Sequence, residues 1–203
     1  MAENRLPQAL AEVVSQIAGL PGLGPKSALR IAMVFLKWPE TRTRQLGRAI
    51  YELRDNLHLC SRCGALTDAD PCRVCADPAR SQETLCLVSD WDSMLTLEDG
   101  GFYSGLYLIL GGLLAPLDNV TPDALELERL EKRLAQGAVT ELILALGTRI
   151  EAESTASFIR NRVAAKFPHV AVTRLAQGIP LGAEVRFMDK ETLRQSLTYR
   201  QKL

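Results

Sequence analysis

Apolar residues recur at helical spacing in the first third of the chain, which predicts an all-helical region over residues 5–57. The first helix is indicated by Leu6, Leu10, Val13, Val14 and Ile17. A second helix is expected to start at Pro25, because proline at the first helical position costs no hydrogen bond. Its inward positions are expected to be Ala28, Leu29, Ala32, Phe35 and Leu36. A third helix is expected after Pro39, with Leu46, Ala49, Ile50, Leu53 and Leu57 on one face.

Short apolar runs alternate with helical patterns over residues 84–175. The expected strands are Leu85–Val88, Leu106–Leu110, Glu141–Leu146 and Val170–Leu175. The expected helices are Trp91–Leu97, Pro122–Gln136 and Ala152–Phe167. The runs are continuously apolar, as in strands covered on both faces, so this segment is predicted to be α/β with a mostly parallel sheet. A Gly/Pro-rich loop over residues 177–182 then precedes a short expected strand, Glu184–Met188, and a helix, Lys190–Leu197.

The composition of the 203 residues, 47% of them hydrophobic, fits one or two globular domains. The longest uncharged stretch, residues 100–117, is broken by Gly111, Gly112 and Pro116, so no membrane span is expected. Glu3 and Arg5 stand where a signal peptide would be apolar, so we expect a cytoplasmic location.

Charge is unevenly distributed although the net charge is zero. Residues 1–57 hold eight Lys/Arg against five Asp/Glu, residues 58–83 three against four, and residues 84–203 thirteen against fifteen. A mildly basic first third points to a nucleic-acid surface there, although random scatter of surface charge would give a similar excess.

A glycine-containing turn links the first two predicted helices, Leu20-Pro21-Gly22-Leu23-Gly24-Pro25-Lys26-Ser27-Ala28. Glycines at 22 and 24 permit backbone angles closed to other residues, so the turn can expose bare N–H groups at the start of a helix. Such a turn can hold a phosphate oxygen without reading a base. The string resembles a helix-hairpin-helix element, and the candidate DNA-binding residues are Gly22, Gly24, Lys26, Ser27 and Arg30. A purely structural turn, or one that also makes subunit contacts, is the alternative.

Four of the five cysteines fall within sixteen residues, as Cys60-x2-Cys63 and Cys72-x2-Cys75. Two such pairs complete a tetrahedral zinc site, and four protein ligands leave no open position for catalysis. The sequence therefore predicts a structural Zn, which would supply much of the folding free energy of so small a module. Cys86 is expected in the core, and His58 is expected to be a partly exposed structural residue.

The order of these features resembles the RecR family of recombination mediators over nearly the full length. The resemblance rests on the glycine turn, the cysteine pairs, Leu110-Gly111-Gly112, residues 115–118, Glu151-x-Glu153 and residues 176–182. It implies a helix-hairpin-helix region over residues 1–57, a zinc module over 58–80, and a Toprim-like domain over 81–175. It further implies a C-terminal segment, residues 176–203, that makes intersubunit contacts, including the stretch Val185–Asp189.

Catalytic Toprim domains hold Mg²⁺ with a Glu after the first strand and an Asp-x-Asp pair after a later one. By resemblance the pair falls on Glu151 and Glu153, which form a partner-binding surface or a vestigial Mg site. Ser89 stands at the first-strand position, and nearby Asp90 and Asp92 are displaced in register. Ordinary acidic residues that open a helix are the alternative for Glu151 and Glu153.

Three functions remain open at this point. The first, implied by the resemblance, is a non-enzymatic DNA-binding mediator that oligomerises as a dimer or tetrameric ring. It would act with RecO-like and possibly RecF-like proteins to load recombinase onto single-stranded DNA. The second is a Mg-dependent Toprim phosphotransfer enzyme, such as a nuclease or primase-like protein, against which Ser89 argues. The third is a protein-interaction scaffold without DNA affinity.

Overall fold

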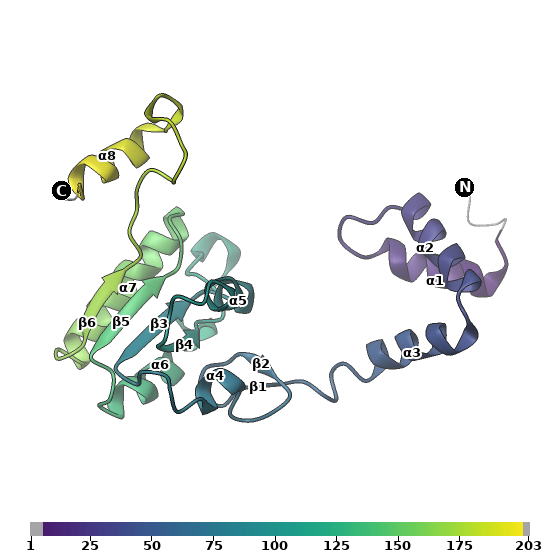
Figure 1. The fold of residues 1–203 in the computed structure, drawn as a ribbon, viewed down its shortest axis with the longest axis horizontal. Helices are drawn as coiled ribbons and strands as arrows, with labels where there is room; N and C mark the ends of the chain where they lie inside the picture. The colour runs from purple at the N-terminus through teal and green to yellow at the C-terminus, as the bar shows by residue number, and fades with distance from the viewer. Residues whose placement is uncertain (1–5, 201–203) are drawn as a thin grey trace. The chain divides into compact units, whose positions relative to one another are not determined.

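The computed structural model describes residues 6–200, which belong to two compact units, residues 1–57 and 58–203 (Figure 1). Within the described residues no helix is both long and apolar enough to cross a membrane. The first unit is all helical, and the second contains every β-strand described.

The first unit consists of α1 (Gln8–Ala18), α2 (Pro25–Lys37) and α3 (Glu40–Tyr51). Helix α2 begins at Pro25, as the sequence predicts, and its small residues Ala28 and Ala32 are buried. The Thr43 hydroxyl donates to the carbonyl of Phe35 at 3.0 Å, which ties the start of α3 to the end of α2.

Two predictions for this unit are wrong. Leu36 does not face inward, because 68% of its surface is exposed. Helix α3 ends at Tyr51, so Leu53 and Leu57 lie beyond it, and Ile50 is 65% exposed. The periodicity of α2 and α3 does identify an apolar face on each helix. However, three short helices do not have enough surface to cover both of these faces.

The second unit is built on a parallel four-stranded sheet in the order β4-β3-β5-β6. Its strands are β3 (Thr84–Val88), β4 (Leu106–Ile109), β5 (Glu141–Ala145) and β6 (Ala171–Arg174). The α/β fold with a mostly parallel sheet is therefore confirmed, and all four strands lie where the apolar runs predict them.

Alternate residues of the strands enter two separate apolar cores, as the pleat of a sheet requires. One core, on the face with Leu87, Leu108 and Leu142, is covered by α6 (Leu127–Ala135) and α7 (Ile150–Lys166). The other core holds Cys86, Val88, Tyr107 and Ile109, which pack with Met94 of α5 (Trp91–Asp99) and with the four clustered cysteines. The cysteine module thus forms part of one cover of the sheet.

The expectation that every strand is covered on both faces is wrong for β6. It is an edge strand, and three of its four residues are exposed. The predicted helix Pro122–Gln136 is also divided, into a 3-10 turn over Pro122–Ala124 and α6, because Leu125 is extended between them.

The C-terminal segment contains no strand over residues 184–188, contrary to the prediction. Residues Val185–Phe187 form a 3-10 turn, in which the Phe187 N–H donates to the Glu184 carbonyl. Asp189 then accepts a hydrogen bond from the Thr192 N–H at 2.9 Å and starts α8 (Lys190–Thr198). Because the cap of α8 follows this turn directly, residues 184–188 do not form an extended strand. The predicted C-terminal helix is confirmed.

Candidate nucleic-acid interface and zinc site

The turn between α1 and α2 depends on one glycine conformation. Gly22 has a φ of 77°, which side-chain-bearing residues rarely adopt, and the Leu23 N–H closes the turn on the Leu20 carbonyl at 3.1 Å. Gly24 has φ −93° and ψ 168°, angles open to any residue, and a Cβ there would meet nothing within 4 Å. The expectation that both glycines use forbidden angles is therefore right for Gly22 and wrong for Gly24.

Several backbone N–H groups of this turn have no hydrogen-bond partner among residues 6–200. They belong to Gly22, Gly24, Lys26 and Ser27. No side chain caps α2, and Pro25 occupies its first turn. Unpaired N–H groups at the positive end of a helix can donate to the oxygens of an anion such as phosphate.

Two cations lie beside these N–H groups. Lys26 and Arg30 are four residues apart on α2, which places them on the same side of the helix, and both are exposed. Neither forms an ion pair with any carboxylate in the part of the chain that the structure describes. The turn therefore presents amides and free positive charge together.

The four clustered cysteines, Cys60, Cys63, Cys72 and Cys75, are all buried, and their sulfur atoms lie within 4.8 Å of one another. The Sγ atoms of Cys63 and Cys72 are 3.6 Å apart. Sulfurs bonded to one tetrahedral zinc at about 2.3 Å are separated by roughly 3.8 Å. The cluster is thus suited to bind zinc, as the spacing predicts.

The electrostatics of the cluster also favour a bound cation. Burial acts to raise the pKa of the Cys60 thiol, but backbone N–H groups of Cys72, Cys63 and Arg62 lower it to about 7. The hydrogen bond with Cys75, burial and neighbouring thiolates hold the pKa of Cys63 well above its usual range. Four thiolates this close repel one another, and a bound zinc ion removes that repulsion.

The cysteine module is anchored to the sheet by backbone and by one arginine. It comprises β1 (His58–Leu59), β2 (Leu66–Thr67) and α4 (Arg73–Ala76). The Ile109 N–H donates to the Cys63 carbonyl at 2.8 Å, which connects the end of β4 to the cysteine module. Arg129 of α6 donates to the carbonyls of Cys60 at 3.1 Å and Ser61 at 2.5 Å. Sequence reasoning missed Arg129, because its partners lie almost seventy residues away.

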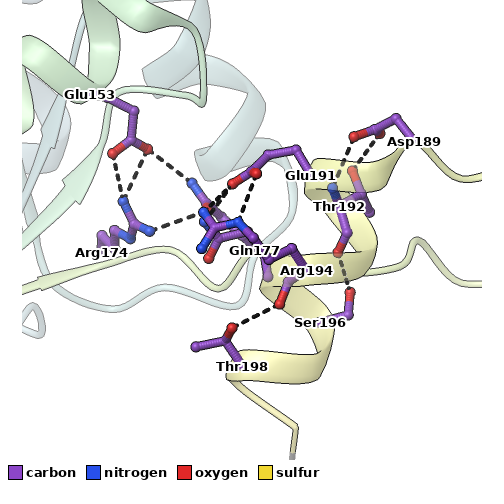
Figure 2. Close-up of polar contacts among 10 residues, drawn as sticks. Glu153, Arg174, Gln177, Asp189, Glu191, Thr192, Arg194, Ser196 and Thr198 are labelled. Carbon is purple, nitrogen blue, oxygen red and sulfur yellow. Dashed lines mark hydrogen bonds and ion pairs between the residues drawn. The ribbon is translucent and has the colours of Figure 1, made fainter.

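Glu151 and Glu153, the acidic pair proposed as a vestigial Mg site, lie in the first turn of α7, but their side chains differ in their contacts. Arg174 donates to both carboxylate oxygens of Glu153, at 3.0 and 2.9 Å, and Gln177 donates to one of them at 3.2 Å (Figure 2). Glu151 is exposed and forms no hydrogen bond through its side chain among the described residues. An arginine therefore occupies the position next to Glu153 that a cation would take.

The residues after the first strand are also engaged in local structure. Asp90 accepts the Ser93 N–H at 2.8 Å as the cap of α5, and the Ser89 hydroxyl donates to its other oxygen at 2.8 Å. The Ser93 N–H and the Ser89 hydroxyl hold the pKa of Asp90 below its usual value. No three carboxylates converge on one point within residues 6–200. The acidic residues of this face do not fit a catalytic Mg²⁺ site.

Comparison with family models defines the class of protein. Residues 6–54 match a RecR helix-hairpin-helix model, residues 57–77 a RecR four-cysteine zinc finger domain, residues 83–176 a Toprim domain, and residues 178–201 a RecR C-terminal model. The chain is thus a Toprim-domain protein with a helix-hairpin-helix region and a zinc finger built on four cysteines.

Curated relatives narrow this class to one family. The chain is 69% identical to a protein named Recombination protein RecR from Nitratidesulfovibrio vulgaris, over 98% of this chain and all of the relative. It is 56% identical to the protein of the same name from Maridesulfovibrio salexigens, with the same coverage. It is 38% identical to that of Deinococcus radiodurans, over 97% of this chain and 88% of the relative. The chain belongs to the RecR family of recombination proteins.

Proposed function

We propose that this protein is a DNA-binding recombination mediator that acts without catalysing a reaction. It oligomerises around or along DNA and cooperates with RecO-like and possibly RecF-like proteins to load recombinase onto single-stranded DNA in the cytoplasm. The observation that carries the proposal is the α1–α2 turn. There, four backbone N–H groups and the cations Lys26 and Arg30 lie together, and none of them has a protein partner among residues 6–200. Amides and cations together suit phosphate oxygens and carry no base preference.

Assembly into an oligomer is supported by the exposed apolar residues of the first unit. Ile50, Tyr51 and Leu53 are 65%, 83% and 55% exposed, and Leu36 on α2 is 68% exposed. A unit of 57 residues buries little apolar surface by itself, so these side chains favour contact with another protein surface. A second copy of the chain is the occupant we propose.

A Mg-dependent Toprim enzyme is disfavoured by the contacts of the acidic face. Glu153 is paired with Arg174, and Asp90 caps α5. An assay on nicked, gapped and supercoiled DNA with each of several divalent metals tests this alternative. Turnover that is lost in a Glu151→Gln, Glu153→Gln double variant would replace the mediator proposal with an enzymatic one.

The test of DNA binding is a double substitution, Lys26→Ala with Arg30→Ala, compared with Lys37→Ala on the same helix. We expect weaker binding to single- and double-stranded DNA and a shallower dependence of affinity on salt, because fewer counterions are released. Fluorescence anisotropy at several salt concentrations measures both quantities. If the double variant has the same affinity and salt slope as the unsubstituted protein, the α1–α2 turn is not the DNA-binding site.

A further inference from the structure

A second cationic site lies in the other unit, between the cysteine module and α6. It is a pocket of about 420 Å³ into which side chains of both elements project. Its charged lining residues are Arg62, Glu126, Glu128, Arg129, Lys132 and Arg133. We propose that this pocket binds the phosphate oxygens of a nucleic-acid backbone, as a contact separate from the α1–α2 turn; the inference rests on the proposed function.

The charges of the pocket do not cancel. Glu126 pairs with Arg129 at 3.0 Å, and Glu128 pairs with Lys132 at 3.6 Å. Both carboxylates are thereby matched, whereas Arg62 and Arg133 form no ion pair among the described residues. Two guanidinium charges are therefore available to an anion.

The positive charge of the pocket contrasts with the net charge of the unit that contains it. Residues 58–203 hold sixteen Lys/Arg against nineteen Asp/Glu, so the unit as a whole is negatively charged. The pocket, with four Lys/Arg against two Glu, is positively charged although its unit is not. It provides a local attraction for an anionic ligand.

Both available arginines are held in place by neutral partners. Arg62 donates to the Cys75 carbonyl at 3.1 Å, and Arg133 donates to Gln136 at 3.2 Å and Gln82 at 2.7 Å. A guanidinium has five N–H donors, so each arginine keeps donors free for a phosphate after these bonds form. These hydrogen bonds restrain the two side chains before a ligand binds, which reduces the conformational entropy lost on binding.

The pocket also lies where two parts of the chain are joined by hydrogen bonds. Arg62 lies between two zinc-site cysteines, and Arg133 lies on a helix that packs against the sheet. Arg129 fixes the distance between these parts through its bonds to the Cys60 and Ser61 carbonyls. The two cations therefore come from different elements that are connected to each other, and both line one pocket that can receive a phosphate group.

The experiment compares Arg62→Gln with Arg133→Gln in one chain against a charge-matched control, Arg160→Gln with Lys190→Gln. The control residues are exposed, lie in the same unit and do not line the pocket. DNA affinity is measured by anisotropy over a series of salt concentrations. We expect the pocket variant to bind about tenfold or more weakly, with a slope of log affinity against log salt reduced by about 1 to 2, and the control to change much less.

Direct contact is tested by arginine modification with phenylglyoxal, followed by mass spectrometry of the unsubstituted full-length protein with and without DNA. Protection of Arg62 and Arg133 by DNA supports the proposal. Zinc content and melting temperature of each variant establish that an affinity loss does not reflect unfolding of the module.

The outcomes separate this inference from the proposed function. If the unsubstituted protein binds DNA but the pocket variant keeps its affinity and salt slope, the pocket proposal is overturned and the mediator proposal stands. Equal modification of Arg62 and Arg133 with and without DNA likewise overturns it. If the unsubstituted protein binds no DNA even at low salt, both proposals are overturned.

Discussion

The guanidinium of Arg129 on α6 donates a hydrogen bond to the backbone carbonyl of Ser61, which lies between the first two zinc-site cysteines. The same nitrogen donates to the Cys60 carbonyl, and Nε is paired with Glu126 at 3.0 Å. One side chain therefore ties the zinc module to the helix that covers the opposite face of the sheet. A change in the zinc module should therefore affect the stability of α6, and a change in α6 should affect the stability of the zinc module.

Replacing Arg129 with alanine should lower the free energy of unfolding by about 1–3 kcal/mol, because two carbonyls lose charged donors. Urea unfolding monitored by circular dichroism measures the change. Lys132→Ala on the same helix is the matched control: its side chain is 78% exposed, so we expect a change of no more than about 0.5 kcal/mol. Equal effects of the two substitutions would show that Arg129 does not anchor the module.

Removing zinc should destabilise more than the cysteine module. The cysteines share a core with Val88, Tyr107 and Ile109 of the sheet, so loosening the module exposes one of the sheet's two apolar faces. Chelation, or a Cys63→Ser substitution, is expected to lower the melting temperature of the α/β unit and to increase binding of an apolar dye. One zinc per chain before chelation, measured by metal analysis, is the companion result. A melting temperature that is insensitive to chelation would contradict this coupling.

Local patterns in the sequence predict most of the elements because their causes are local. The four strands, the start of α2 at Pro25 and the cysteine cluster follow from short-range periodicity and spacing. The 3-10 turn at Val185–Phe187 escapes prediction because its apolar residues resemble a strand, and the decisive feature is the cap that Asp189 provides immediately afterwards.

Other features could not be predicted because they depend on residues far apart in the chain. The exposure of β6 follows from its place at the sheet edge, which periodicity does not encode. The pairing of Glu153 with Arg174 and the bond from Arg129 to Ser61 each join separate elements. The exposure of apolar residues on α2 and α3 could not be predicted for a similar reason. The sequence pattern identifies the apolar face of a helix, but not the surface that packs against that face.

Asp90 should behave as a helix cap and not as a metal ligand. Asp90→Ala is expected to cost about 1 kcal/mol of stability, because the Ser93 N–H loses its acceptor, whereas Asp90→Asn should retain most of it. Asp92→Ala, an exposed residue of the same first turn, is the control and should cost less. Thermal unfolding with and without millimolar Mg²⁺ measures all four proteins. A Mg²⁺-dependent rise in melting temperature that disappears in Asp90→Asn would contradict this assignment.

The acid sensitivity of the fold should depend in part on Glu131 of α6. Its carboxylate accepts hydrogen bonds from Lys166 at 2.9 and 2.8 Å and from Arg162, both on α7, and these bonds lower the pKa of Glu131 below its ordinary value of 4.5. A group with a lowered pKa in the folded state stabilises the protein above the ordinary value, and this contribution is lost as pH falls through the folded-state pKa.

Glu131→Gln should therefore be less stable than the unsubstituted protein by about 1 kcal/mol at pH 7, a value typical of a partly exposed ion-pair network. The difference should shrink as the pH falls below 4.5, because the unsubstituted carboxyl becomes protonated as well. Comparing the two proteins by urea unfolding at each pH cancels the effect of acid on the zinc site, which both share. Glu128→Gln, whose side chain is 91% exposed, should show little difference at either pH. A Glu131→Gln difference that stayed constant from pH 7 to pH 3 would mean that the lost side chain stabilised α6 against α7 by packing and not by its charge.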